Sequence, residues 1–268
     1  MTDLNSLIAD ENNVLVSIDR RTMHNSLAAR LTPFMLAVGA LLTTAGFILA
    51  FTTAPPVNGV TVDGVEMIGD TLVSNQLLFS QKIFYFHMPV AIASFLALAG
   101  TAYCGIRFLA SRDAAWDLRA RVSTEVALIF VIMVMASGEM WERFEWGVWW
   151  TWEPRLTTYF ILTLLVMGYF VLRAAVDEPE RRAVFASVFG IIMFIDVPIC
   201  FAITRLVPSG VHPTIFRTDS GLSPDMLMPL LLALFGMMFI AYGLYLLRVR
   251  TAELENRLEH AKEILDEE

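Results

Sequence analysis

The chain has 268 residues, of which 56% are hydrophobic and 17% charged, and its mean hydropathy is +0.61. Because soluble domains have about 45–50% apolar and about 25% charged residues, this composition argues against a soluble enzyme, a disordered chain and a coiled coil. The formal net charge of −8 argues against nucleic acid as the main partner, since phosphate binding needs a basic protein face.

Six apolar runs follow a polar leader, residues 1–32, which is expected to be cytoplasmic. Each run has about 20 residues, the length that an α-helix needs to cross a bilayer. The runs cover residues 33–54, 83–105, 122–141, 156–173, 183–204 and 225–247. They lack the two-residue alternation of β-barrel strands. The sequence therefore predicts an all-α, polytopic membrane protein with six transmembrane helices in residues 33–247 and short outer loops.

The distribution of Lys and Arg indicates the orientation of these helices. With both termini in the cytoplasm, 14 of the 19 basic residues fall on the cytoplasmic side and 5 on the outer side. Cytoplasmic loops carry such an excess of positive charge. The outer loop 55–82 contains Pro55-Pro56 and several Gly and Asp residues, so we expect turns or a short hairpin there.

His87, at the outer end of the second run, is the first candidate site residue. An ionisable side chain near or within a span is unfavourable, so one found there is a functional candidate. His24 and His260 lie in polar cytoplasmic segments and are expected to be solvated surface residues.

Five of the six tryptophans lie in one outer loop, between Trp141 and Trp152. An interfacial aromatic belt would spread its aromatic residues over several helix ends. Their concentration favours a platform for a flat, apolar ligand with polar edges. A helix through the loop would place four side chains on one face and Trp152 on another. The four are Trp146, Trp149, Trp150 and Glu153.

Three charged residues in or near the spans each have two readings. Arg155 either reaches lipid head groups or pairs with a carboxylate on the ligand, because guanidinium forms bidentate pairs with carboxylates. Glu153 either orients Arg155 or caps the following helix. Asp196, inside the fifth run, either makes a structural hydrogen bond to a neighbouring helix or has a role in the site or in proton handling.

The last outer loop and a C-terminal tail complete the chain. His212 lies in that loop, on the same side as His87 and the tryptophans in the predicted topology. Residues 248–268 are predicted to form a cytoplasmic helical tail, because four apolar residues recur there at helical spacing. They are Leu254, Leu258, Ala261 and Leu265. This stripe contacts a partner or the membrane surface, or belongs to a solvated helix.

Two histidines are suitable axial ligands for a haem iron. The aromatic platform beside them suits the flat, apolar macrocycle. Imidazole suits iron, and haem is flat and apolar with two propionates for arginines. A zinc or copper site fits less well, because no third or fourth ligand of the usual kind lies nearby. Cys104 and Cys200 lie in separate apolar runs and form no CxxC pair, so we expect two buried thiols.

Residues 146–157, WGVWWTWEPRLT, lie in the loop 141–157 and resemble the tryptophan-rich WWD signature of the haem-handling proteins of cytochrome c maturation. With its six spans and flanking histidines, the chain resembles the CcmC family, also called haem exporter protein C, over roughly residues 30–250. That family usually has Asp where this chain has Glu153, which keeps the acid and adds one methylene.

The resemblance implies that the protein binds haem b at the outer face of the bacterial inner membrane and delivers it to the chaperone CcmE. His87 and His212 would be the axial ligands of the iron. The other implied haem contacts are Trp146, Trp149, Trp150, Trp152, Glu153 and Arg155. The implied partners include the CcmA ATPase and the membrane subunits CcmB and CcmD. Because the sequence has no hydrolytic triad or phosphate-binding loop, we expect no enzymatic activity.

Three alternatives stay open for the sequence. A transmembrane haem transporter would need polar or ligand-bearing positions through the cytoplasmic half of the spans, and the sequence has none there. A quinone-linked oxidoreductase with intramembrane haem would need histidines deep in the spans. In a structural permease subunit of an ABC exporter, the histidines would matter little.

Overall fold

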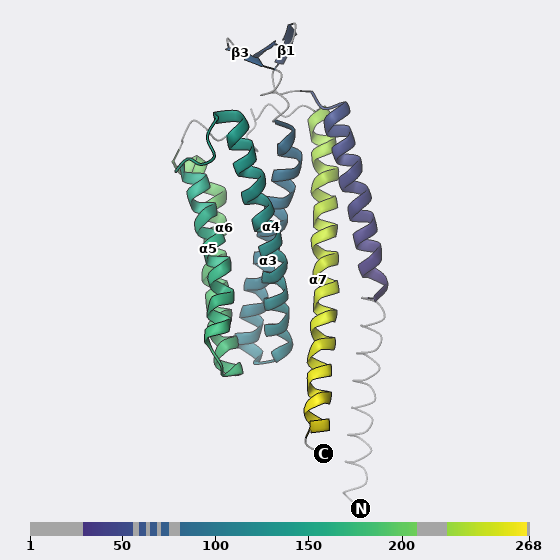
Figure 1. The fold of residues 1–268 in the computed structure, drawn as a ribbon, viewed down its shortest axis with the longest axis vertical. Coiled ribbons are helices and arrows are strands. Elements are labelled where there is room, and N and C mark those ends of the chain that lie inside the picture. Colours follow the sequence, from purple (N-terminus) through teal and green to yellow (C-terminus); the bar gives the residue numbers. More distant parts are fainter. Residues whose placement is uncertain are drawn as a thin grey trace, which may run out of the picture.

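The computed structural model describes residues 29–55, 59–62, 65–68, 71–74, 81–207 and 224–266. Within this part, six helices are long and apolar enough to cross a membrane, which confirms the predicted all-α, polytopic class. They are Ala29–Thr52, α3 (Phe84–Ser111), α4 (Ala114–Trp146), α5 (Pro154–Ala175), α6 (Pro179–Leu206) and α7 (Pro224–Asp266). Figure 1 shows them side by side along one long axis.

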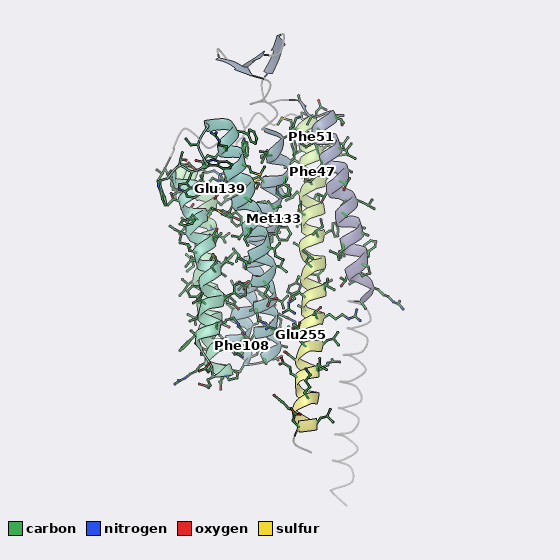
Figure 2. All side chains as sticks on the ribbon, viewed as in Figure 1. Phe47, Phe51, Phe108, Met133, Glu139 and Glu255 are labelled. Carbon is green, nitrogen blue, oxygen red and sulfur yellow. The ribbon has the colours of Figure 1, made fainter. Side chains whose placement is uncertain are left out.

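The two ends of the bundle differ in sequence. At the tryptophan end, residues 147–153 connect α4 to α5, and at the arginine end, Arg112 and Asp113 connect α3 to α4. Phe51 lies near the tryptophan end and Phe108 near the arginine end (Figure 2). The helix α7 continues beyond the arginine end to Asp266 without a break (Figure 1).

Local sequence determines where several helices begin and end. The Asp113 side chain caps α4 by accepting a hydrogen bond from the Ala115 N–H (2.9 Å). Gly147 ends α4 in the left-handed conformation (φ 75°), which glycine adopts without a Cβ clash. The first residues of α5, α6 and α7 are Pro154, Pro179 and Pro224. Proline suits a first helical position because the N–H that it lacks has no helical partner there.

Glycines let the helix Ala29–Thr52 lie directly against α7. A Cβ atom at Gly236 would be 2.6 Å from the Thr43 nitrogen and 2.9 Å from the Gly39 carbonyl oxygen. A larger residue at 236 would therefore push the two backbones apart, as expected where small residues mediate helix contacts in membranes. Elsewhere, α3 packs against α4, α6 and α7, and α5 packs against α6.

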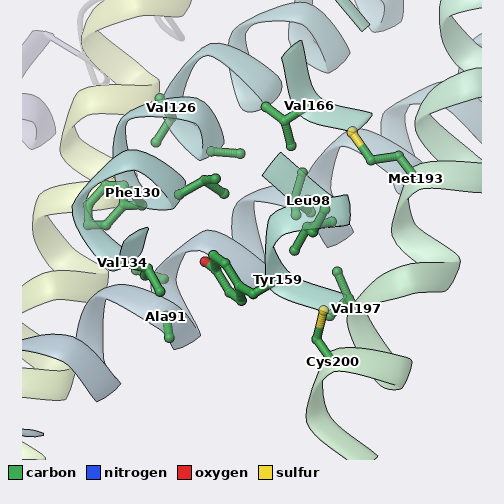
Figure 3. Close-up of a cluster of buried hydrophobic side chains, with 14 of the residues drawn as sticks. Ala91, Leu98, Val126, Phe130, Val134, Tyr159, Val166, Met193, Val197 and Cys200 are labelled. Carbon is green, nitrogen blue, oxygen red and sulfur yellow. The ribbon is translucent and has the colours of Figure 1, made fainter. Parts of the chain in front are cut away.

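The interior of the bundle is an apolar core that α3, α4, α5 and α6 build together (Figure 3). Leu98 and Phe130 are at most 1% exposed, and the Tyr159 hydroxyl shares a hydrogen bond with the Ser94 hydroxyl (2.8 Å). Cys104 and Cys200 are both buried and unpaired with each other, which confirms the prediction for the thiols. The core fixes the helix positions that carry the site described below.

A small sheet lies beyond the tryptophan end, between the first helix and α3 (Figure 1). Its strands β1 (Gly59–Val62), β2 (Val65–Ile68) and β3 (Thr71–Ser74) pair antiparallel in this order. The sequence predicted turns or a short hairpin there, and the structure has two successive hairpins. The difference arises because three short runs rich in Val, Ile and Thr suit strands.

Lys82 joins the two ends of this outer loop. It lies in the short 3-10 helix η1 (Gln81–Ile83), and its ammonium group donates a hydrogen bond to the Ala54 carbonyl oxygen (2.5 Å). Partial burial lowers the pKa of Lys82, because the charged form loses solvation. The contact holds the end of the first helix close to the start of α3.

Candidate functional site

His87 lies in the first turn of α3, at the tryptophan end, and α4 holds its ring. Its Nδ1 atom is 2.9 Å from the Ser137 hydroxyl oxygen. The Ser137 hydroxyl itself donates to the Met133 carbonyl oxygen (2.8 Å). The Ser137 hydroxyl thus links the His87 ring to the backbone of α4. A hydrogen bond on one ring nitrogen of a histidine orients the ring and the other nitrogen, as in histidines that bind metals.

Two further residues of α4 shape the place of the His87 ring. Trp141 packs against it edge to face, with ring centroids 6.0 Å apart and planes at 75°. A Cβ atom at Gly138 would be 3.2 Å from the His87 Cε1 atom, so a residue with no side chain leaves room for the ring. Sequence reasoning missed Ser137 and Gly138, because nothing in the sequence pairs them with a residue about 50 positions earlier.

The tryptophan loop is not helical beyond Trp146, so the shared face that a helix through the loop would create does not form. The helix α4 ends at Trp146 because Gly147 adopts the left-handed conformation, and residues 147–153 run without helix to α5. The orientations of Trp149, Trp150 and Glu153 therefore depend on an irregular loop and not on a helical repeat. The Trp146 side chain lies outside the described part of the structure.

The loop gives its tryptophans different surroundings. Trp150 is half-buried and packs edge to face against Trp152 and Phe160, with centroids 5.5 Å and 5.6 Å away. Trp149 is 61% and Trp152 is 73% exposed. The Arg143 guanidinium lies 5.8 Å from the Trp149 ring centre. Half-buried Trp150 thus anchors the loop, and two exposed indole surfaces remain at this end.

Glu153 caps α5, which is one of the two roles that the sequence left open. Its Oε1 atom accepts a hydrogen bond from the Leu156 N–H (3.2 Å), and its side chain is mostly buried. The next charged residue, Arg155, is half-buried. Among the described residues, the Arg155 guanidinium forms no hydrogen bond or ion pair, although the Glu153 carboxylate attracts it more strongly than the like charge of Arg205 repels it. Such a group favours an added anion.

Four residues at the tryptophan end bury polar atoms that have no hydrogen-bond partner among the described residues. The atoms are the Tyr85 hydroxyl oxygen, both Glu142 carboxylate oxygens, Trp150 Nε1 and the Thr151 hydroxyl oxygen. Glu142 is only 2% exposed. Because buried polar groups are almost always hydrogen-bonded in native proteins, this concentration fits a bound group with polar edges. The sequence flagged neither Tyr85 nor Glu142 as site residues.

The same geometry tests whether haem suits the site. The described residues contain no group of three or more His, Cys, Asp or Glu side chains that could hold a metal ion. Haem iron needs only two axial protein ligands, because the porphyrin supplies the other four nitrogens. The oriented histidine, the exposed indoles and the unpaired guanidinium therefore fit haem. The second predicted ligand, His212, lies outside the described residues.

Asp196 takes part in a local contact within α6. Its Oδ2 atom accepts a weak hydrogen bond from the Cys200 thiol one turn later (3.5 Å). Both residues belong to α6, so this contact lies within one helix and is not the predicted hydrogen bond to a neighbouring helix.

The chain is similar to known proteins over most of its length. The family model described as Heme exporter protein C matches residues 71–264. A protein of Bradyrhizobium diazoefficiens named Heme exporter protein C is 28% identical over 179 residues, which cover 66% of this chain and 66% of that protein. The Escherichia coli K12 protein of the same name is 26% identical over 171 residues, or 64% of this chain and 69% of the relative.

A plant relative extends the comparison beyond bacteria. It is a putative cytochrome c biosynthesis ccmC-like mitochondrial protein of Marchantia polymorpha, 25% identical over 170 residues. The match covers 63% of this chain and 72% of the relative.

Proposed function

Since the chain belongs to the CcmC family, heme exporter protein C, we propose that it holds haem at the outer face of the bacterial inner membrane and delivers it to the chaperone CcmE. The family membership supports a role in haem handling for cytochrome c biogenesis. The observation that carries the finer proposal is the His87 ring. The Ser137 hydroxyl orients it through a hydrogen bond at Nδ1, at the end of the bundle that bears the tryptophan loop.

The proposed haem site assigns a role to each predicted residue. His87 and His212 bind the iron of haem b as axial ligands. Trp146, Trp149 and Trp152 offer indole surfaces to the apolar macrocycle, and Trp150 anchors the loop. Bound haem supplies the iron and the porphyrin that are passed on, and the protein holds and orients them without catalysing a reaction.

Polar groups of the loop would bind the haem edge. Arg155 pairs with a propionate, because its guanidinium has no ion-pair partner among the described residues. Glu153 acts on haem indirectly, since its cap fixes the start of α5 and with it the backbone of Arg155. The buried Trp150 Nε1–H and Thr151 hydroxyl are further donors for a polar edge.

The proposed partners divide the work of export. The protein receives haem and presents it to CcmE, while the CcmA ATPase with CcmB and CcmD supplies the energy for releasing the loaded chaperone. The arginine end would face the cytoplasm, because most described Lys and Arg residues lie there.

A visible absorption spectrum tests the axial ligands. We expect the detergent-purified protein with added haem to give the Soret band of a low-spin, six-coordinate haem. His87→Ala and His212→Ala should each lose or shift the band, because each removes one axial ligand. His260→Ala, a histidine of the cytoplasmic tail, is the matched control and should keep it. Unchanged spectra in both ligand variants would contradict the proposal.

A further inference from the structure

A cavity of about 410 Å³ lies at the arginine end, opposite to the proposed haem site. The end of α3, the starts of α4 and α6, the last turn of α5 and Asn256 of α7 form its walls. Its charged lining residues are Arg112, Asp117, Arg121, Arg173, Glu180 and Arg182. Four guanidinium groups thus face two carboxylates, which leaves an excess of two positive charges.

One carboxylate of the cavity is fully engaged. Asp117 accepts two hydrogen bonds from Arg173, at 2.7 Å and 2.9 Å, and both side chains are mostly buried. A bidentate pair of this kind holds both groups in place. Asp117 therefore neutralises Arg173 and no other cation of the cavity.

The second carboxylate is weakly engaged. Glu180 lies 3.8 Å from Arg112, and both side chains are more than half exposed, at 74% and 54%. Exposed pairs at this distance contribute little, because water screens them. Arg112 also has a left-handed backbone (φ 59°), which is uncommon for a residue with a side chain.

Arg121 and Arg182 carry the excess charge. The carboxylate nearest to Arg121 is Glu125, at 3.8 Å, and Glu125 already accepts a shorter hydrogen bond from Arg248 (2.6 Å). Arg182 has no ion pair with any residue that the structure describes. Two guanidinium groups without a dedicated carboxylate suit the oxygens of a phosphate, which accept their paired N–H donors.

The start of α6 adds to this field, whereas at the start of α4 the Asp113 carboxylate already caps the first turn. Ala114 is the first residue of α4 and Pro179 is the first residue of α6. The positive end of a helix dipole attracts anions. At α6 the capping residue Glu178 makes no side-chain hydrogen bond to the first turn.

The surroundings of the cavity indicate the kind of phosphate. Apolar side chains of α3, α5 and α6 point outward next to it, with Ile106 54%, Val171 68% and Phe185 50% exposed. Phe108 contributes to the cavity wall itself and lies near this end of the bundle (Figure 2). Charged helix ends that meet a lipid-facing surface lie at the depth of lipid head groups, where basic pockets between helices bind anionic lipids.

We propose that this cavity binds the phosphate of an anionic phospholipid head group, through Arg121 and Arg182. The site is separate from haem binding and does not depend on that function. A lipid held there would link the ends of α3 and α5 to the starts of α4 and α6.

Lipid binding to the full-length protein in detergent tests the proposal. Native mass spectrometry would count adducts of phosphatidylglycerol and phosphatidylcholine on the wild type and on the variant Arg121→Gln/Arg182→Gln. The control Arg119→Gln/Arg181→Gln removes the same charge from neighbouring positions that do not line the cavity. We expect phosphatidylglycerol to be preferred by the wild type and the control. The cavity variant should bind it about fivefold more weakly for each arginine removed.

Competition with inorganic phosphate distinguishes the two sources of this chemistry. Phosphate that displaces phosphatidylglycerol at equal concentration would identify a site for free phosphate and overturn the lipid assignment. An equal loss in both double variants would show general surface attraction and overturn the site itself. If the double variant does not fold, Arg182→Gln against Arg181→Gln gives the same comparison, with about a fivefold difference expected.

Discussion

At the scale of single residues, the histidine of the proposed haem site depends on α4. The Ser137 hydroxyl shares a hydrogen bond with Nδ1 of His87, Gly138 leaves space for the ring, and Trp141 packs against it. The three residues lie within two turns of one helix. A histidine in the first turn of α3 acquires a fixed ring orientation only because this face of α4 lies opposite to it.

The substitution Ser137→Ala tests this orientation. It removes the oxygen that shares the Nδ1 hydrogen bond, so the ring loses the contact that orients it. We expect haem affinity to fall by about 10–100-fold, as for other outer-shell partners of ligating histidines. Titration of the purified variant with haem, followed by absorption, measures the change.

A second serine of α4 provides the control for this prediction. The Ser123 hydroxyl donates to the Ala97 carbonyl oxygen of α3 (2.7 Å), far along the helix from the site. Ser123→Ala should leave haem affinity unchanged. Equal affinities for Ser137→Ala and the wild type would mean that Ser137 has no part in orienting the ligand.

At the scale of elements, the connection between α4 and α5 gives the tryptophan loop its form. Gly147 ends one helix, and Glu153 with Pro154 starts the next. Between them, Trp150 packs against Phe160 of α5 and ties the loop to that helix. A substitution at the start of α5 can therefore alter the loop without replacing any tryptophan.

The substitution Glu153→Ala tests the cap of α5. It removes the acceptor of the Leu156 N–H, and we expect a loss of about 0.5–2 kcal/mol in the free energy of unfolding. Haem retention should fall too, because Arg155 lies in the turn that loses its cap. Glu153→Asp should restore most of both, because Asp is also a good capping residue.

The corresponding residue of α6 is a matched control. Glu178 is the N-cap of α6 but makes no side-chain cap hydrogen bond. Glu178→Ala should change stability little and leave haem retention intact, as measured by chemical unfolding in detergent and by haem content. A loss as large as that of Glu153→Ala would refute a specific role for the α5 cap.

At the scale of the whole molecule, the two ends of the bundle have different chemistry. The tryptophan end has exposed indoles, buried polar atoms without described partners and the small sheet. The arginine end has ion pairs, a basic cavity and the extension of α7. Under the proposed orientation, haem is handled at one membrane surface and lipid at the other.

Labelling of introduced cysteines tests this orientation. Val148 at the tryptophan end is 43% exposed and Leu258 on the α7 extension is 58% exposed. A membrane-impermeant maleimide should label Val148→Cys in intact spheroplasts, but Leu258→Cys only after the membrane is opened. Cys104 and Cys200 are buried, so the unsubstituted protein gives the background. The reverse pattern would invert the proposed topology.

The number of spans and the all-α class followed from the sequence alone, as did the choice of His87, Trp149 and Arg155 as candidate site residues. Length, hydropathy and residue type are local properties, and a membrane selects helices for any apolar run of this length. The burial of the two cysteines followed in the same way from the runs that contain them.

The contacts that orient these candidate residues depend on the tertiary structure. It brought Ser137 to His87 and Asp117 to Arg173 across separations of 50 and 56 residues. It also showed that the tryptophan loop follows an irregular path after Gly147 and that Glu153 caps α5. Contacts between distant segments depend on how whole helices pack, and a left-handed glycine changes the direction of everything after it, so neither follows from a local pattern.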